Sequence, residues 1–259
     1  MLLVVDAGNT TTRVGIQRQG HLTQLATAST RNTSQLIEQL QHQIAPLTET
    51  QAALPGHAHL DVALSSVVPQ AEEAWLKWAA ARQYPLFIVK GETATPLTNR
   101  YQSSSRLGGD RLAAAVGAVA RLGAPVIVAS LGTATVVDAV SSESQFLGGA
   151  ICVGVQTGLA ALAEKTAALP EVRADAPQSL IGSVTEDCLR AGASYGVAAL
   201  LEGLAQRMRE HIGADAPLAL TGGHADLVSP LLRLEHHVFP TLTLEGLAAI
   251  WRHNHRRPA

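Results

Sequence analysis

A polar, glycine-containing segment follows the first apolar run of the chain. Residues 2–5 (LLVV) resemble a strand buried on both faces, and Asp6, Ala7, Gly8, Asn9 and Thr10 come directly after it. A glycine in such a turn lets backbone N–H groups approach a phosphate closely, because no Cβ intervenes. Asp6 can hold Mg²⁺ through its water shell, and Arg13 could reach a phosphate from the next strand. A β-turn without a ligand favours the same residue types, so both interpretations stand.

A second glycine turn occupies the matching place in the second half of the chain. Gly132 and Thr133 open the segment GTAT, whose small residues and hydroxyls could cradle terminal phosphates. Moving the first segment forward by 124 positions places Asp6 on Ser130 and Gly8 on Gly132. The ungapped match of strand, glycine turn, strand, hairpin and strand suggests an internal duplication. A nucleotide held between two glycine turns needs such a pair, whereas two unrelated turns do not.

The third candidate segment lies in the middle of the chain. Gly108, Gly109, Asp110 and Arg111 precede LAAAVGAVARLG, a strong helix former. Asp110 could cap that helix by accepting its first N–H groups. It could equally act as a general base that takes the proton of a substrate hydroxyl during phosphoryl transfer. Arg111 can bind a carboxylate or a phosphate bidentately.

Hydrophobic periodicity supplies the elements that must position these residues. Strands are expected at residues 2–5, 13–17, 22–26, 60–67, 86–89, 125–129, 134–140, 146–151 and 218–220, and helices at 34–44, 71–81, 111–123, 185–210, 225–234 and 244–253. The order predicts two β-β-β-α-β-α halves facing each other across a cleft. This is the plan of the duplicated actin/hexokinase-like (ribonuclease H-like, ASKHA) α/β fold. We expect an N-terminal half at residues 1–112, with the phosphate loop, and a C-terminal half at 113–259 for nucleotide binding and dimerisation.

Composition excludes several other classes of protein. The 259 residues carry a net charge of -2, which provides no basic surface for nucleic acid or an anionic membrane. Two cysteines are too few for a disulfide framework, and no uninterrupted apolar run approaches the length of a membrane span. The first residues lack the pattern of a signal peptide. We therefore expect a cytoplasmic protein that contacts neither nucleic acid nor membrane.

Taken together, the motifs resemble the bacterial type III pantothenate kinases over nearly the full length. The similarity rests on the order and spacing of short motifs: DAGNT at residues 6–10, Tyr101, GGDR at 108–111, GTAT at 132–135, GGAI at 148–151, TAALP at 166–170, Thr185, TGG at 221–223 and LTLEGL at 242–247. The resemblance implies ATP-dependent phosphorylation of pantothenate to 4′-phosphopantothenate, the first step of coenzyme A biosynthesis. It also implies Mg²⁺ bound with ATP, a monovalent cation such as K⁺ or NH₄⁺, and a homodimer.

The resemblance also implies a role for individual residues. Asp110 would be the catalytic base for the primary hydroxyl of pantothenate. Tyr101, Gly108, Gly109, Asp110, Arg111 and Thr185 would line the pantothenate pocket. The nucleotide would contact Asp6, Ala7, Gly8, Asn9, Thr10, Thr11, Thr12, Arg13, Gly132 and Thr133. Asp6 would hold Mg²⁺ through water.

The chain departs from the family pattern at a few positions. Ser130 replaces an aspartate that helps bind the monovalent cation, and a serine offers only neutral oxygens. Val153 replaces a proline, Ser104 stands where a proline often follows the tyrosine, and Arg13 replaces a lysine. A serine at position 130 resembles the Bvg accessory factors, so a non-catalytic accessory role is one alternative. An actin-like kinase of another small alcohol is the other, because a fold does not fix its substrate.

Overall fold

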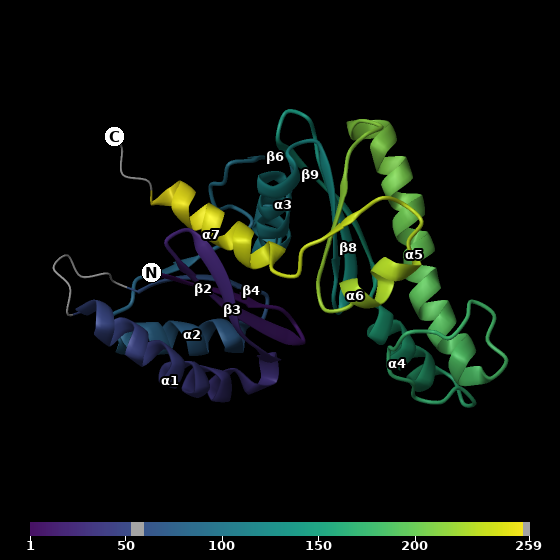
Figure 1. The fold of residues 1–259 in the computed structure, drawn as a ribbon, viewed down its shortest axis with the longest axis horizontal. Coiled ribbons are helices and arrows are strands. Elements are labelled where there is room, and N and C mark those ends of the chain that lie inside the picture. The colour runs from purple at the N-terminus through teal and green to yellow at the C-terminus, as the bar shows by residue number, and fades with distance from the viewer. Residues whose placement is uncertain (53–59, 256–259) are drawn as a thin grey trace. The chain divides into compact units, whose positions relative to one another are not determined.

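The computed structural model describes residues 1–52 and 60–255, which form two compact units (Figure 1). Unit 1 contains residues 1–96, 102–117 and 241–259, and unit 2 contains residues 97–101 and 118–240. The expected boundary at 112/113 differs from this division in two ways. The change of unit falls inside the helix α3 (Gly109–Leu122), and the C-terminal helix α7 (Leu242–Asn254) belongs to unit 1. The reason is that α7 packs against strands of the first sheet.

Unit 1 is built on a five-stranded sheet in the order β3-β2-β1-β4-β5. Its strands are β1 (Leu2–Ala7), β2 (Thr11–Arg18), β3 (His21–Ser29), β4 (Asp61–Ser66) and β5 (Leu86–Ile88). The central strand β1 pairs antiparallel with β2 and parallel with β4. Every residue of β1 is buried, as expected for a strand covered on both faces.

Helices cover both faces of this sheet. Helices α1 (Thr33–Ala52) and α2 (Pro69–Ala81) lie on one face, where they share an apolar core with alternate residues of β1 and β4. Helix α7 packs against β1, β2 and β4, and in Figure 1 it lies on the side opposite to α1 and α2. Gly246 of α7 sits so close to the carbonyl of Ala113 that a Cβ at this position would clash with the backbone of α3. This glycine therefore lets α7 and α3 approach each other directly.

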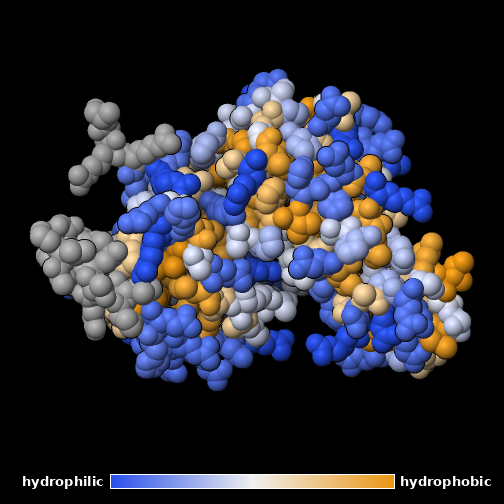
Figure 2. All heavy atoms as spheres, in the orientation of Figure 1, coloured by the Kyte–Doolittle hydropathy of each residue, from blue (hydrophilic) through white to orange (hydrophobic). Residues whose placement is uncertain are grey.

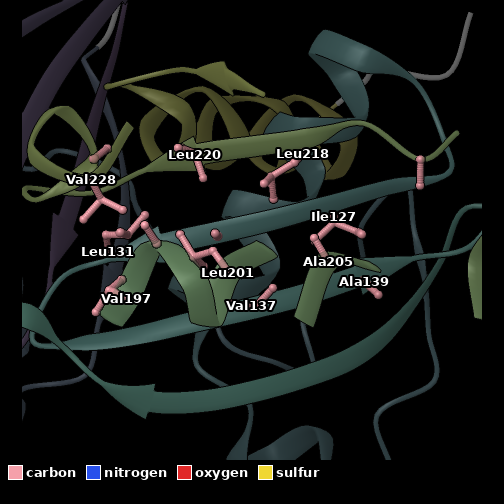
Figure 3. Packing of buried hydrophobic residues seen from close by; sticks show 14 of the residues in the cluster. Ile127, Leu131, Val137, Ala139, Val197, Leu201, Ala205, Leu218, Leu220 and Val228 are labelled. Carbon is pink, nitrogen blue, oxygen red and sulfur yellow. The ribbon is translucent and has the colours of Figure 1, made fainter. Parts of the chain in front are cut away.

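Unit 2 repeats the plan around a six-stranded sheet in the order β11-β10-β7-β8-β9-β6. Its strands are β6 (Thr98–Asn99), β7 (Val126–Leu131), β8 (Ala134–Val140), β9 (Gln145–Val153), β10 (Leu218–Thr221) and β11 (His237–Val238). The long helix α5 (Thr185–Ile212) packs on β7 and β8. Figure 3 shows Val197, Leu201 and Ala205 of α5 beside inward-facing residues of β7, β8 and β10.

The two sheets confirm the expected fold class. Strand β7 covers the residues that lie 124 positions after β1, and the starts of β3 and β9 differ by the same offset. In each sheet the first strand pairs antiparallel with the second and parallel with the fourth main strand. The duplicated β-β-β-α-β-α unit inferred from the sequence is thus present in both halves.

Some elements differ from the expectation. Strands β1 and β7 extend through Ala7 and Leu131, so Asp6 and Ser130 lie inside strands instead of opening turns. Helix α4 (Val155–Lys165) lies in a segment for which no helix was expected. Helix α6 (Ala225–Val228) ends early and continues as the 3₁₀ helix η3 (Ser229–Leu231), where Pro230 interrupts α-helical hydrogen bonding.

Within residues 1–52 and 60–255, no helix is both long enough and apolar enough to cross a membrane.

Candidate active site

Three polar side chains form a row across the sheet of unit 1. Asp6 of β1 pairs with Arg13 of β2 on one side and with Ser65 of β4 on the other. Directly paired residues on neighbouring strands point to the same face of a sheet. The alternate residues of β1, such as Leu3 and Val5, belong to the core shared with α1 and α2. The row therefore faces away from α1 and α2.

The first turn of α3 lies against this row. Gly109 is packed so tightly that a Cβ would clash with the carbonyl of Val89 and would lie 3.0 Å from the Ser65 hydroxyl. Only a glycine lets the start of α3 come this close to the ends of β4 and β5. Asp110 follows in the first turn, where the helix dipole favours a negative charge. The glycine pair that precedes Asp110 thus positions the helix that carries it.

Asp6 and Asp110 are close enough to influence each other electrostatically. The pKa of Asp6 is raised to about 7, mainly by burial and secondly by the negative charge of Asp110, while the positive charge of Arg13 lowers it. Burial likewise raises the pKa of Asp110, although its carboxylate accepts hydrogen bonds from the backbone N–H groups of Arg111 and of Asp110 itself. Carboxyl groups with raised pKa values are suited to proton transfer near neutral pH.

A chain of threonine hydroxyls holds the loop between β1 and β2 from the opposite face. The Thr30 hydroxyl donates to the carbonyl oxygen of Gly8 at 2.7 Å. Its single proton is thereby used, so the hydroxyl of Thr12, 3.0 Å away, must be the donor to Thr30. The backbone N–H of Thr30 donates to the carbonyl of Thr10 at 2.9 Å. Thr12 is fully buried in this network, so its hydroxyl supports the loop from behind.

The outer part of the loop borders an open pocket in unit 1. This pocket has a volume of about 360 Å³ and is lined by Asn9, Thr30, Arg31, Thr33, Ser34, Val68, Gln70, Ala71 and Ala74. Asn9 and Thr10 are exposed, while Gly8 and Thr11 are half-buried. The backbone N–H of Gly8 donates to the carbonyl of Thr11 at 3.0 Å, which closes the turn.

Unit 2 repeats the row without its charges. Ser130 of β7 pairs with Val136 of β8 and with Thr221 of β10. These positions correspond to Asp6, Arg13 and Ser65 in the sheet of unit 1. Ser130 takes the place of Asp6, Val136 that of Arg13 and Thr221 that of Ser65. The side chains of this row therefore offer only neutral oxygen atoms. Of the two rows, only that of unit 1 carries charged side chains.

The glycine turn of unit 2 is fixed by its own carbonyl groups. The carbonyl of Thr133 accepts a hydrogen bond from the hydroxyl of Thr157 at 2.7 Å and another from the N–H of Gly154 at 3.2 Å. The N–H of Gly132 donates to the carbonyl of Ala134 at 3.0 Å. The Thr133 side chain is left exposed. The unexpected helix α4, which carries Thr157, therefore braces this turn.

The remaining predicted residues of unit 2 lie on two further segments. Tyr101 follows β6, its N–H donates to the side chain of Asn99 at 2.9 Å, and its ring lies 6.4 Å from that of Phe146 between centroids. Thr185 is the first residue of α5 and is exposed. Tyr101 is half-buried.

Sequence reasoning missed two residues that the structure brings to the site. Ser65 lies beside Asp6 only because β4 runs parallel to β1, a pairing between segments far apart in the chain. Thr30 meets the Gly8 carbonyl across 22 residues. Two signals were available in the sequence. Two serines follow the apolar run of β4 in the segment SSVVP at residues 65–69, and the alternation of side chains along β2 turns Thr12 toward the interior.

The donor set restricts which metal ion could bind. In the described part of the chain, no group of three or more His, Cys, Asp or Glu side chains could hold a metal ion. Any ion beside Asp6 would take few protein ligands. Mg²⁺, which keeps several waters and binds one or two carboxylates together with substrate phosphates, fits this arrangement.

The threonine network gives a first prediction. Replacing Thr30 with valine keeps the side-chain shape but leaves the Gly8 carbonyl and the Thr12 hydroxyl without their partner, which costs about 1–3 kcal/mol of folding stability. We expect a lower melting temperature and weaker binding of Mg·ATP, measured by calorimetry. Thr30→Ser, which keeps the hydroxyl, is the matched control and should retain most of the affinity. Equal nucleotide affinity in the valine variant would show that the network does not shape the loop.

Comparison with known proteins gives the family. The model of the family described as type III pantothenate kinase matches residues 2–207. The type III pantothenate kinase of Thermomicrobium roseum is 35% identical over 262 residues, covering 99% of this chain and 98% of the relative. The type III pantothenate kinase of Myxococcus xanthus is 35% identical over 260 residues, covering 98% of this chain and 99% of the relative.

Solved structures agree with the fold. A protein described as a Baf family transcriptional activator from Campylobacter jejuni matches with a TM-score of 0.60 at 19% identity, covering 97% of this chain and 98% of its own. One described as a 2-dehydro-3-deoxygalactonokinase from Sinorhizobium meliloti matches with a TM-score of 0.54 at 18% identity, covering 99% and 100%. These likenesses show the actin/hexokinase-like fold alone. The matches in sequence show more: the chain belongs to the type III pantothenate kinase family.

Proposed function

We propose that this protein transfers the γ-phosphoryl group of ATP to the primary hydroxyl of pantothenate, giving 4′-phosphopantothenate in the first step of coenzyme A biosynthesis. The observation that carries the proposal is the pair of neighbouring carboxyl groups, the buried Asp6 and the half-buried Asp110, beside Arg13 in a chain of this family. Such a pair supplies one carboxylate for the nucleotide's metal ion and one for the proton of the acceptor. The use of ATP as phosphoryl donor favours the cytoplasm as the place of action.

Asp110 is the catalytic base in this account. As the hydroxyl oxygen of pantothenate forms a bond to the γ-phosphorus, the bond from that phosphorus to the β-γ bridging oxygen breaks and ADP leaves. The hydroxyl proton passes to the Asp110 carboxylate. Burial raises the pKa of this carboxyl, which makes it a better acceptor than a solvated aspartate. Its place in the first turn of α3 fixes its position.

The nucleotide phosphates are held by the loop after β1. Residues Ala7, Gly8, Asn9, Thr10 and Thr11 form this loop, and Arg13 adds a positive charge next to Asp6. The Gly8 N–H already closes the turn onto the Thr11 carbonyl, so the proposed donors are those at the exposed end of the loop, Asn9 and Thr10. Asp6 would hold Mg²⁺ through water, and the ion would supply positive charge to the phosphates. Thr12 acts through the loop, because its hydroxyl donates to Thr30. By the family pattern, Gly132 and Thr133 are also proposed to contact the nucleotide.

The pantothenate contacts carry over from the family pattern. Gly108, Gly109 and Arg111 surround the base, and the Arg111 guanidinium suits the carboxylate of pantothenate. By the same pattern, Tyr101 and Thr185 are proposed to contribute hydroxyl groups to the pantothenate pocket. Thr185 lies at the N-terminus of the 28-residue helix α5, where the helix dipole favours an anionic group.

A monovalent cation, K⁺ or NH₄⁺, is a further part of the proposal. Ser130 and Thr221 lie side by side at the ends of β7 and β10, where their neutral oxygens can contribute ligands to such an ion. The lack of a carboxylate in this row predicts weaker binding than in relatives with aspartate at position 130. Turnover measured with K⁺, with NH₄⁺ and with neither tests this role.

The active form is proposed to be a homodimer, and exposed apolar residues of unit 2 support this. Strand β9 exposes Leu147, Ile151 and Val153 on one face. A second apolar surface surrounds an open pocket of about 540 Å³ lined by Leu180, Ile181, Gly182, Cys188, Ala191, Gly192, Tyr195 and Gly196. Ile181 is 87% exposed. Figure 2 shows hydrophobic residues at the outer edge of the part formed by α4, α5 and their connecting loop. Apolar surfaces of this kind mark protein interfaces.

The central test of the function is phosphorylation of pantothenate by the purified protein with Mg·ATP, compared with the variant Asp110→Asn. The amide cannot accept the proton, so we expect turnover to fall by about two to four orders of magnitude. Asparagine is isosteric and removes a buried charge, so the melting temperature should stay the same or rise. Absence of turnover in the folded wild-type protein would refute the proposed function. Unchanged turnover in the variant would refute the role of Asp110 as base.

If two copies associate through the apolar pocket around Ile181, a charge placed there should weaken their association. Ile181→Asp places a carboxylate where a partner would bury an isoleucine, so we expect monomers by analytical ultracentrifugation. Leu76→Asp is the matched control, because Leu76 of α2 is an exposed apolar residue of unit 1. A wild-type protein that sediments as a monomer, or an Ile181→Asp variant that stays dimeric, would exclude this interface.

A further inference from the structure

The hydroxyl of Ser65 is buried and has no hydrogen-bond partner in the structure. Ser65 is 1% exposed, and its oxygen is among the few buried side-chain polar atoms that lack a partner. Folded proteins pair nearly all such groups, so an unpaired one calls for an explanation, such as use in a bound state. A serine that served only to fill space would be better replaced by alanine, which lacks the polar atom.

The surroundings of this hydroxyl are those of the phosphoryl-transfer site. Ser65 pairs with Asp6 in the parallel β1–β4 register, so both side chains point to the same face of the sheet. The place where a Cβ of Gly109 would lie is 3.0 Å from the Ser65 oxygen, which puts the hydroxyl beside the first turn of α3. Asp110 belongs to that turn and acts electrostatically on Asp6. The unpaired Ser65 hydroxyl thus lies near the two carboxyl groups, Asp6 and Asp110.

We propose that Ser65 is a ligand-binding residue of this site, whose hydroxyl donates a hydrogen bond to an oxygen atom that binds beside Asp6 and Asp110. The acceptor belongs to the Mg·ATP group: either a terminal phosphate oxygen or a water of the metal ion. The oxygen atom of either group can accept a hydrogen bond from the Ser65 hydroxyl. The inference rests on the proposed function, because that function brings Mg·ATP to Asp6.

The neighbouring serine provides a contrast within the same strand end. The Ser66 hydroxyl donates to the carbonyl of Val68 at 3.0 Å and accepts from its N–H at 3.2 Å. Its hydrogen bonds are complete in the absence of ligand, as in a structural turn. Although Ser65 and Ser66 are adjacent in the chain, we therefore expect their alanine variants to change the melting temperature of the ligand-free protein in opposite ways.

The experiment compares Ser65→Ala and Ser66→Ala in two measurements. In the ligand-free protein, we expect Ser65→Ala to keep or raise the melting temperature, because it removes an unsatisfied group, and Ser66→Ala to lower it. With Mg·nucleotide, we expect Ser65→Ala to reduce affinity and kcat/KM by about tenfold to a hundredfold, the effect of one hydrogen bond to a charged group. Ser65→Cys, a close isostere with a weaker donor, should lie between the alanine variant and the wild type.

Two nucleotides distinguish the acceptors. A loss of affinity for a non-hydrolysable Mg·ATP analogue but not for Mg·ADP would assign the hydroxyl to the terminal phosphate. Equal losses for both would assign it to a metal-bound water. Wild-type affinity and turnover in Ser65→Ala would overturn the inference, as would a drop in the melting temperature of its ligand-free form. Because nucleotide affinity is measured without pantothenate, failure of the inference and failure of the proposed function are distinguishable.

Discussion

The burial of the Asp6 carboxyl group next to a second, half-buried carboxyl group, Asp110, is the constraint on which the rest of unit 1 depends. Asp6 is only 7% exposed, and both burial and the charge of Asp110 oppose its ionisation. A single arginine, Arg13, offsets part of this penalty. The fold tolerates the arrangement because β1 is held on both sides by β2 and β4 and because α3 is fixed by close packing at Gly109. Ligand binding that supplies positive charge would relieve the repulsion, which is how a substrate–metal complex can be favoured by a strained site.

The duplicated fold shows how one architecture serves two purposes. The row formed by Arg13, Asp6 and Ser65 in the first sheet corresponds to Val136, Ser130 and Thr221 in the second. Only the first row carries charge, although the strand pairing is the same. The second sheet instead forms a large apolar core with α5. Unit 2 also exposes apolar residues on β9 and around the 540 Å³ pocket. In the proposed function, the catalytic base therefore belongs to unit 1 and the dimer interface to unit 2.

Much of this could be predicted from the sequence, for identifiable reasons. The offset of 124 positions predicted matching strands, and apolar runs such as residues 2–5 fixed the central strands, because buried strands have few alternatives. Helix α4 was missed: its segment carries Gly154 and Gly158, although a glycine can precede or enter a helix at modest cost. The early end of α6 depends on Pro230.

The candidate site was predictable only in part. Asp6, Arg13 and Asp110 could be proposed from motifs, because each stands in a recognisable local pattern. Ser65 and Thr30 could not, because their partners lie far away in the chain and depend on strand register and on the position of η1 (Thr30–Asn32). The inward orientation of Thr12 likewise follows from tertiary packing, since a motif alone does not tell a ligand contact from a support beneath the loop.

The most direct test of the central claim is the pH dependence of folding stability in the ligand-free protein. The pKa of Asp6 is about 7 in the folded protein against an ordinary value of 3.8, so the folded state holds more protons between these pH values, and stability falls as pH rises through that range. Asp6→Asn removes this penalty, which amounts to about 4 kcal/mol once Asp6 is fully ionised. Denaturant unfolding at pH 5 and pH 8 should therefore show the variant gaining stability over the wild type as the pH increases. A difference between the two proteins that does not change with pH would contradict the account.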